Sequence, residues 1–265
     1  MERGKTGRSG GGEPALVEPP NVMLSETRAA YLGPGLALSP HRNAVATLAI
    51  ALESAFELRI LDEPESPPAA TKIAVIPPDT LHHLVSHGAM LFLYLDAHGD
   101  DYARIDEQAL RRPGDELARA VRQRLETGAA GDAVACRLES VCRELGIPAR
   151  PEAPAAIRRV LRAIDRDPRE FPSLRPAAEL AGLSESRFRH VFRETVGASF
   201  RRYRLWKRMA VVGRALQARA SLTTAALEAG FSSSAHLSAA FRTMFGIAPS
   251  DLLTLGTRFE VDRPT

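Results

Sequence analysis

The sequence of 265 residues has little cysteine and no long apolar run. Because no stretch of 18 apolar residues occurs, no segment is predicted to span a membrane. The first 20 residues are rich in Gly, Arg and Pro and lack the apolar core of a signal peptide, so we expect a disordered tail on a cytoplasmic protein. The two cysteines, Cys136 and Cys142, are too few for a four-thiolate zinc site, and we expect reduced, semi-buried thiols.

The motifs of common enzymes are also missing. No Ser/His/Asp order, phosphate-binding glycine loop or paired-carboxylate motif stands out in the sequence. We therefore predict a protein that is not an enzyme, with no catalytic residue, no bound metal and no cofactor.

The net charge of +3 hides an asymmetry between the two parts of the chain. Residues 151–265 hold 19 Lys and Arg against 11 Asp and Glu, which gives +8. The remaining residues hold 16 basic against 21 acidic side chains, which gives −5. A phosphate backbone attracts the basic part, so the charge pattern favours a nucleic-acid partner for residues 151–265.

Strand-like patterns dominate from about residue 29 to residue 96. Four short apolar runs, at residues 45–52, 56–61, 72–76 and 90–95, are separated by turn clusters. They predict a small antiparallel barrel or sandwich. Alternating side chains are expected to line an interior that either holds one small ligand or is filled by the protein itself, namely Leu48, Ile50, Phe56, Leu58 and Phe92.

Two helical patterns follow, between about residues 105 and 145. Their apolar stripes consist of Leu110, Leu117, Val121 and Leu125, and of Val134, Leu138, Val141 and Leu145. The apolar surface of the two stripes is larger than one small barrel needs to cover its own core, so the stripes predict a homodimer. The alternative is that both stripes pack within one subunit. Prolines close to Ile147 then indicate a linker.

The last third of the chain contains a near-repeat at a spacing of about 48 residues. The stretch 174–182 reads again at 222–230 with the same leading Leu, central Ala-Ala and final Ala-Gly, so each copy ends in glycine. Each is followed by a second amphipathic pattern, seated by Phe188 and Phe192 in the first copy and by Leu237 and Phe241 in the second. A short Ala-rich helix, a glycine break and a second helix make a helix-turn-helix, so the chain is predicted to carry two.

The residues of this repeat resemble the AraC/XylS family of bacterial transcription regulators over roughly residues 156–255. The motifs include Ala177-Ala178, Leu180-Ala181, Phe200, Tyr203 and Arg208 in and after the first unit, and Ala229-Gly230-Phe231-Ser232, Phe245-Gly246 and Pro249 in the second. The sequence predicts a left-handed Gly230, a cap of the second helix by Ser232 or Ser233, and a helix end at Gly246.

The resemblance implies a DNA-binding transcription regulator with double-stranded DNA as partner and RNA polymerase as a further possible one. In the first unit it implies that Ser186, Arg189 and His190 read bases in the major groove, with Arg187 and Arg193 on bases or phosphates. The other implied DNA-contacting residues are Arg208 and, in the second unit, Ser233, Ser234, His236, Ala239 and Arg242. Among the groove-facing positions of the second unit only Arg242 is charged, which puts the sequence specificity of that unit in doubt.

The strand-rich half resembles the cupin-type sensing domain common in this family, and the same resemblance points to a homodimer. Cupin enzymes bind metal through a His-x-His pair, which His41-Arg42-Asn43 does not supply. We therefore expect a small-molecule effector oriented by His41, His82 and Phe92, in preference to a metal-dependent cupin enzyme fused to a DNA-binding domain. A DNA-repair methyltransferase fusion, the third alternative, needs more cysteines than the chain has.

The predicted fold is therefore α+β and multidomain. We expect a disordered tail at 1–20, a cupin-like β-barrel with C-terminal helices at 21–147 and a linker at 148–155. A helical DNA-binding domain, in which a long helix joins the two helix-turn-helix units, is expected at 156–257.

Overall fold

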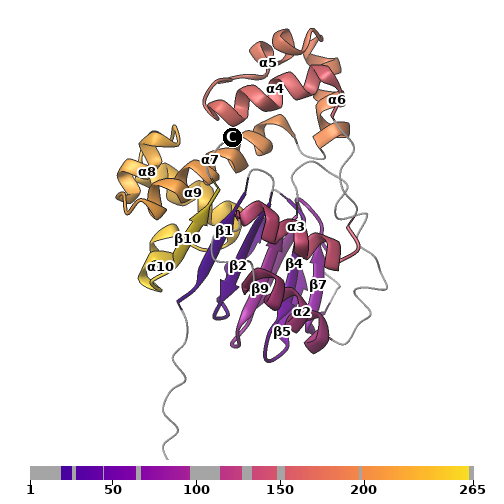
Figure 1. Cartoon of the computed structure of the whole chain (residues 1–265), viewed down its shortest axis with the longest axis vertical. Coiled ribbons are helices and arrows are strands. Elements are labelled where there is room, and N and C mark those ends of the chain that lie inside the picture. The colour runs from indigo at the N-terminus through magenta and orange to yellow at the C-terminus, as the bar shows by residue number, and fades with distance from the viewer. Residues whose placement is uncertain are drawn as a thin grey trace, which may run out of the picture.

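The computed structural model describes residues 19–25, 28–43, 45–63, 67–95, 114–126, 133–147, 153–196 and 199–262. Most of the predicted tail, Leu110 and most of the predicted linker lie outside these residues. No helix within the described ranges is long and apolar enough to cross a membrane. Strands and two helices form the N-terminal part, and the C-terminal part is mainly helical (Figure 1).

The strands divide between two sheets. The first has the order β10-β1-β2-β9-β4-β7, with β10 (Arg258–Val261), β1 (Asn21–Leu24), β2 (Ala29–Gly33), β9 (Met90–Tyr94), β4 (Thr47–Ala51) and β7 (Ile73–Ile76). The second has the order β3-β8-β5-β6, with β3 (His41–Arg42), β8 (Leu81–Val85), β5 (Phe56–Ile60) and β6 (Ala69–Thr71). Because no described strand of one sheet pairs with a strand of the other, the predicted closed barrel is not confirmed; the described strands form two separate sheets.

Strand β4 shows why the predicted interior was partly wrong. All five of its residues are buried, so both faces of the strand are covered. Ala49 and Ala51 face the large core shared with the second sheet and the C-terminal helices, whereas Leu48 and Ile50 belong to the separate core on the opposite face. Phe56 and Phe92 do lie in the large core, and Leu58 packs against it.

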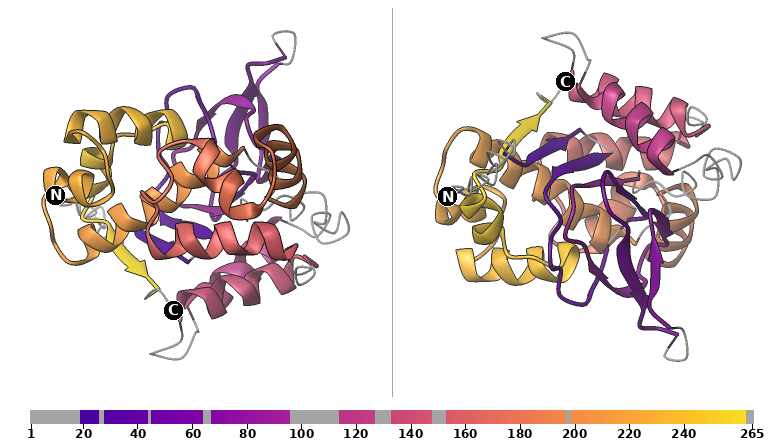
Figure 2. Two further views of the ribbon diagram at one scale, coloured as in Figure 1. Left: turned by 90° about the horizontal axis from the view of Figure 1, so that it is seen from above. Right: turned by 90° about the horizontal axis from the view of Figure 1, so that it is seen from below.

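The second core explains the two apolar stripes. Helices α2 (Gly114–Glu126) and α3 (Val134–Glu144) pack side by side along one face of the large sheet (Figure 2). All described stripe residues are at most 5% exposed: Leu117, Val121, Leu125, Val134, Leu138, Val141 and Leu145. The stripes therefore pack within one subunit, which was the alternative to a dimer interface. The homodimer stays a prediction, but the described stripe residues no longer support it.

The helical C-terminal part has the predicted doubled architecture. Helix α4 (Ala155–Arg166) precedes the first unit, formed by α5 (Leu174–Ala181) and α6 (Glu185–Val196). The long α7 (Phe200–Gln217) joins it to the second unit, formed by α8 (Leu222–Glu228) and α9 (Ser234–Phe245), and α10 (Pro249–Thr254) follows. Phe188, Phe192, Phe200 and Tyr203 meet in one aromatic cluster, with ring centroids 5.3–5.7 Å apart, and this cluster seats α6 on α7.

The chain does not end with the helical domain, because β10 returns to the first sheet. β10 runs parallel to β1, with Asn21 opposite Arg258 and Leu24 opposite Val261. Glu260 forms an ion pair with Arg137 of α3 and accepts a hydrogen bond from Asn21 at 2.5 Å. Both carboxylate oxygens of Asp262 accept N–H groups at the start of α3, at 2.7 Å each. The last strand therefore fastens the helical C-terminal part to the sheet.

Candidate nucleic-acid interface and interdomain cavity

Glycines and serines set the turn geometry of both units. Gly182 follows α5 with φ +70°, and Gly230 follows α8 with φ +77°, so both occupy the left-handed region in which glycine is least strained. The side chain of Ser233 accepts the backbone N–H of His236 at 3.1 Å and caps α9, which decides between the two predicted serines. Phe231 is 2% exposed and fills the turn of the second unit.

Helix α6 presents a polar face opposite its buried aromatic residues. Phe188, Phe192 and Val196 are fully buried. The predicted base and phosphate contacts of this unit are all exposed, namely Ser186, Arg187, Arg189, His190 and Arg193. His190 also lies 3.1 Å from Glu194 one turn on, in an exposed contact that contributes little to stability. The face is therefore free to enter a major groove.

Helix α9 presents a smaller and less basic face. Ala239 and Arg242 are exposed, and Ser234 is half-buried. The exposed His236 is fixed in place, because its Nδ1 lies 3.0 Å from Ser232 Oγ and its ring meets Phe231 edge-on at 5.2 Å. With the hydroxyl of Ser233 used as a cap, Arg242 is the main charged group that this helix offers to DNA.

Arg208 of α7 is a structural anchor of the second unit. Its Nε donates to the carbonyl oxygen of Ala229 at 2.7 Å, and its guanidinium lies 3.7 Å above the ring centre of Phe231. Burial and the nearby Arg204 lower the pKa of Arg208 from its ordinary value. Arg208 thus holds the turn between α8 and α9 in place, in addition to its predicted contact with DNA.

A groove of about 550 Å³ lies between the two units. Arg201, Arg204 and Arg208 of α7 line it at spacings of three and four residues. Arg189 of α6 and His236 and Ala240 of α9 also line it, so it is bordered by the second helix of each unit. No acidic residue belongs to this lining.

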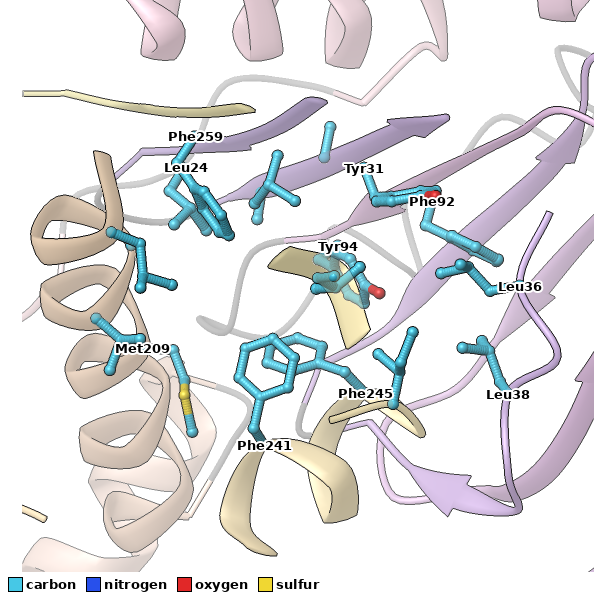
Figure 3. Close-up of a pocket in the computed structure, with 18 residues that line it drawn as sticks. Leu24, Tyr31, Leu36, Leu38, Phe92, Tyr94, Met209, Phe241, Phe245 and Phe259 are labelled. Carbon is cyan, nitrogen blue, oxygen red and sulfur yellow. The ribbon is translucent and has the colours of Figure 1, made fainter. Parts of the chain in front are cut away.

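An apolar cavity of about 60 Å³ lies where the first sheet meets the C-terminal helices (Figure 3). Strands β1, β2 and β9 supply one side, including Leu24, Tyr31 and Phe92. Helices α7 and α9 supply the other, including Met209 and Phe245. The remaining lining residues are Val22, Ala29, Ala30, Leu36, Leu38, Tyr94, Val212, Gly213, Leu216, Phe241, Ile247, Leu252 and Phe259.

The polar groups of this cavity are two phenols. Burial raises the pKa of both Tyr31 and Tyr94 above the ordinary value, so both stay neutral at physiological pH. The hydroxyl of Tyr31 donates to the carbonyl oxygen of Pro34 at 2.8 Å. No charged side chain lines the cavity, which is consequently suited to an uncharged, apolar guest.

Of the three residues predicted to orient an effector, the cavity includes one. Phe92 lines it, whereas His41 and His82 lie outside its lining. The two histidines are buried, paired across β3 and β8, with ring centroids 4.3 Å apart. Each Nδ1 lies within hydrogen-bond distance of a backbone carbonyl oxygen two residues earlier, and His41 packs against Gly246 at the end of α9.

The C-terminal side of the cavity was missed by sequence reasoning. Phe241 was predicted to seat the second helix of its unit and Met209 and Gly213 were not singled out, because no local pattern distinguishes a core side chain from one that lines a cavity. Across the described residues, no cluster of three or more His, Cys, Asp or Glu side chains is placed to hold a metal ion.

Comparisons with known proteins agree with this architecture. Residues 177–254 match a family model described as a helix-turn-helix domain. The fold is similar to that of ToxT from Vibrio cholerae, with 8% sequence identity, a TM-score of 0.54, and coverage of 86% of this chain and 98% of that chain. Unsaturated-fatty-acid-bound ToxT from strain SCE256 gives 12% identity, a TM-score of 0.51 and coverage of 86% and 95%. No curated protein matches the sequence of the chain.

The matched domain and the two exposed helix faces define a regulator that binds duplex DNA through helix-turn-helix units. Residues 177–254 are therefore a helix-turn-helix domain, and the motifs of the last third of the chain are similar to those of AraC/XylS-type transcription regulators.

Proposed function

We propose that this chain regulates transcription from a specific DNA site and that a small, uncharged, apolar molecule in the interdomain cavity controls it. The observation that carries the proposal is the position of the cavity. Its walls combine the sheet of the N-terminal part with α7 and with α9, the second helix of the second unit. A molecule bound there touches the sensing part and the DNA-binding part at once.

The size of the cavity links binding to movement. Drug-sized ligands occupy pockets of roughly 300–1,000 Å³, whereas this cavity has about 60 Å³. A molecule larger than a small fragment must therefore push the side chains of α7 and α9 away from the sheet. Such a ligand binds the opened arrangement more tightly than the closed one, which is the differential affinity that allosteric control requires.

The lining sets the class of effector. ToxT, which has a similar fold, has a structure with a bound unsaturated fatty acid. Here no Lys or Arg lines the cavity, and the available polar groups are the phenols of Tyr31 and Tyr94. A buried carboxylate without a cation is strongly disfavoured. We therefore expect an unsaturated long-chain alcohol to bind better than the matching acid.

The test uses the full chain with palmitoleyl alcohol and palmitoleic acid as matched probes. A ligand that binds only the folded state, at a free concentration 100 times its dissociation constant, raises the free energy of unfolding by roughly 2.7 kcal/mol. This stabilisation is measured as a rise in Tm. We expect this rise with the alcohol and a smaller one with the acid. Val212→Phe, which narrows the cavity, should abolish the rise, whereas Val211→Phe, next to it and outside the lining, should keep it.

The DNA arm of the test is independent. Wild-type protein is used to select duplexes from a randomised library at low salt, and affinity for the selected duplex is measured with and without the alcohol. Failure to enrich any sequence overturns the regulator. Enrichment of a sequence, with neither a Tm rise nor an altered affinity from the alcohol, overturns the effector alone.

The partners implied by family resemblance, a second copy of the chain and RNA polymerase, belong to this proposal. A homodimer must use a surface other than the described stripes of α2 and α3, because these cover the sheet.

A further inference from the structure

The basic side chains in the first half of α7 fall into two groups. Arg202 and Lys207 are neutralised: Arg202 pairs with Asp79 of the N-terminal part, and Lys207 Nζ lies 2.6 Å from Asp165. Arg201, Arg204 and Arg208 recur at spacings of three and four, which places them along one face of a helix. That face lines the groove between the two helix-turn-helix units.

The groove face has no counter-charge in the part of the chain that the structure describes. No carboxylate there pairs with Arg201, Arg204 or Arg208, and none lines the groove. Arg204 and Arg208 are nevertheless half-buried. Burial lowers the pKa of both from the ordinary value, which shows that their charges are held at a cost.

Two guanidinium donors of the residues that line the groove are also left without an acceptor. Arg204 Nε and Arg208 Nη2 are buried atoms with no hydrogen-bond partner within the described residues. A buried donor without a partner is destabilising, and more so in a charged group. Several positive charges and unpaired donors thus belong to residues that line one groove. These features are typical of a site that binds an anion from another molecule.

We propose that Arg201, Arg204 and Arg208 bind a phosphate diester of the DNA backbone between the two major grooves that the units enter. The proposal rests on the proposed function, because the groove lies between α6 and α9. A guanidinium donates two parallel hydrogen bonds to a phosphate, and the N-terminal end of α7 adds positive potential. The site would fix the spacing of the two units on the duplex without reading sequence.

The experiment compares Arg204→Gln with Arg162→Gln in the full chain, on the duplex selected by wild-type protein. Arg162 is an exposed arginine of α4 outside the groove, so both variants lose one charge from the same domain. Arg204→Gln should weaken binding at least 10-fold, equally on the selected duplex and on single-base variants of it. It should also reduce the slope of log affinity against log salt by about 1. Arg162→Gln should change affinity less than threefold.

Phosphate ethylation interference locates the contact. In the wild-type complex, ethylation of a phosphate between the two major-groove sites should block binding, and that position should stop interfering in Arg204→Gln. Unfolding of free Arg204→Gln should occur at an equal or higher Tm than wild type, because a like charge beside Arg208 is removed. A lower Tm would assign the weaker binding to misfolding and overturn the proposal.

Three other outcomes would also overturn it. If Arg204→Gln changes base preference, Arg204 reads a base. If both variants behave alike, only net charge matters. If inorganic phosphate binds wild-type protein and not Arg204→Gln while the ethylation pattern is unchanged, the groove is a site for a free anion. Failure of wild-type protein to select any duplex would instead overturn the proposed function.

Discussion

Replacing Arg208 by alanine tests whether one side chain of α7 holds the second helix-turn-helix unit in place. The substitution removes the 2.7 Å hydrogen bond to the carbonyl oxygen of Ala229 and the guanidinium stacked 3.7 Å from the ring centre of Phe231. Both contacts reach the turn between α8 and α9. The loss should therefore appear in stability as well as in DNA binding.

The two contacts set the expected size of the effect. A hydrogen bond from a charged donor contributes about 1.5–3 kcal/mol, and a cation stacked on an aromatic ring about 0.5–2 kcal/mol. Arg208 is half-buried, which favours the lower end of both ranges. We expect Arg208→Ala to lower the free energy of unfolding by about 2 kcal/mol, whereas the exposed Arg162→Ala should change it by less than about 0.5 kcal/mol.

Urea unfolding followed by tryptophan fluorescence measures the difference. Trp206 is the single tryptophan of the chain and is 3% exposed. Its ring lies 6.1 Å from that of Tyr94 and 6.4 Å from that of Phe245, so it reports on the junction between β9, α7 and α9. If Arg208→Ala and Arg162→Ala unfold at the same urea concentration with the same slope, Arg208 is not an anchor and the reasoning fails.

Two further predictions concern base reading and acid. Arg189→Ala should relax sequence preference by roughly 1–3 kcal/mol at one base pair; equal weakening on selected and random duplexes would instead make Arg189 a phosphate contact. Burial lowers the pKa of His41 from 6.5 to about 4, so the unfolded chain binds more protons between these values and stability falls as the pH drops. Between pH 7 and pH 5 this loss should be about 2 kcal/mol in wild-type protein and clearly smaller in His41→Gln, and equal losses would refute it.

The helical half could be predicted from sequence because its signals are local. Gly182, Gly230 and Gly246 end helices in the left-handed region, and Ser233 caps the helix that follows the second turn. The aromatic residues at helical spacing all point into the core. Each of these features depends on a few neighbouring residues, so a sequence pattern is sufficient to find them.

The sheet half was less predictable because its signals are not local. Leu48 and Ile50 share one face of β4, as the alternating pattern predicts. Because β4 is buried on both faces, the pattern does not show which of the two cores each face contacts. The stripes of α2 and α3 indicated an apolar partner, and this partner is the sheet of the same chain. The basic excess of residues 151–265 is visible in the sequence, whereas the division of the basic residues of α7 into paired and unpaired groups depends on Asp79 and Asp165, which are distant in sequence.

The parallel pairing of β1 with β10 also constrains the order in which the protein can be completed. Leu24 faces Val261, so the outer edge of β1 has to wait for the last strand to be synthesised. At translation rates of about 5–20 residues per second, this wait lasts on the order of 10–50 s. During that time the nascent sheet presents an open edge, which is a template for pairing with other chains. A fragment that stops before Arg258 keeps this edge permanently, so dividing the chain at its apparent domain boundary leaves the sensing half without its closing strand.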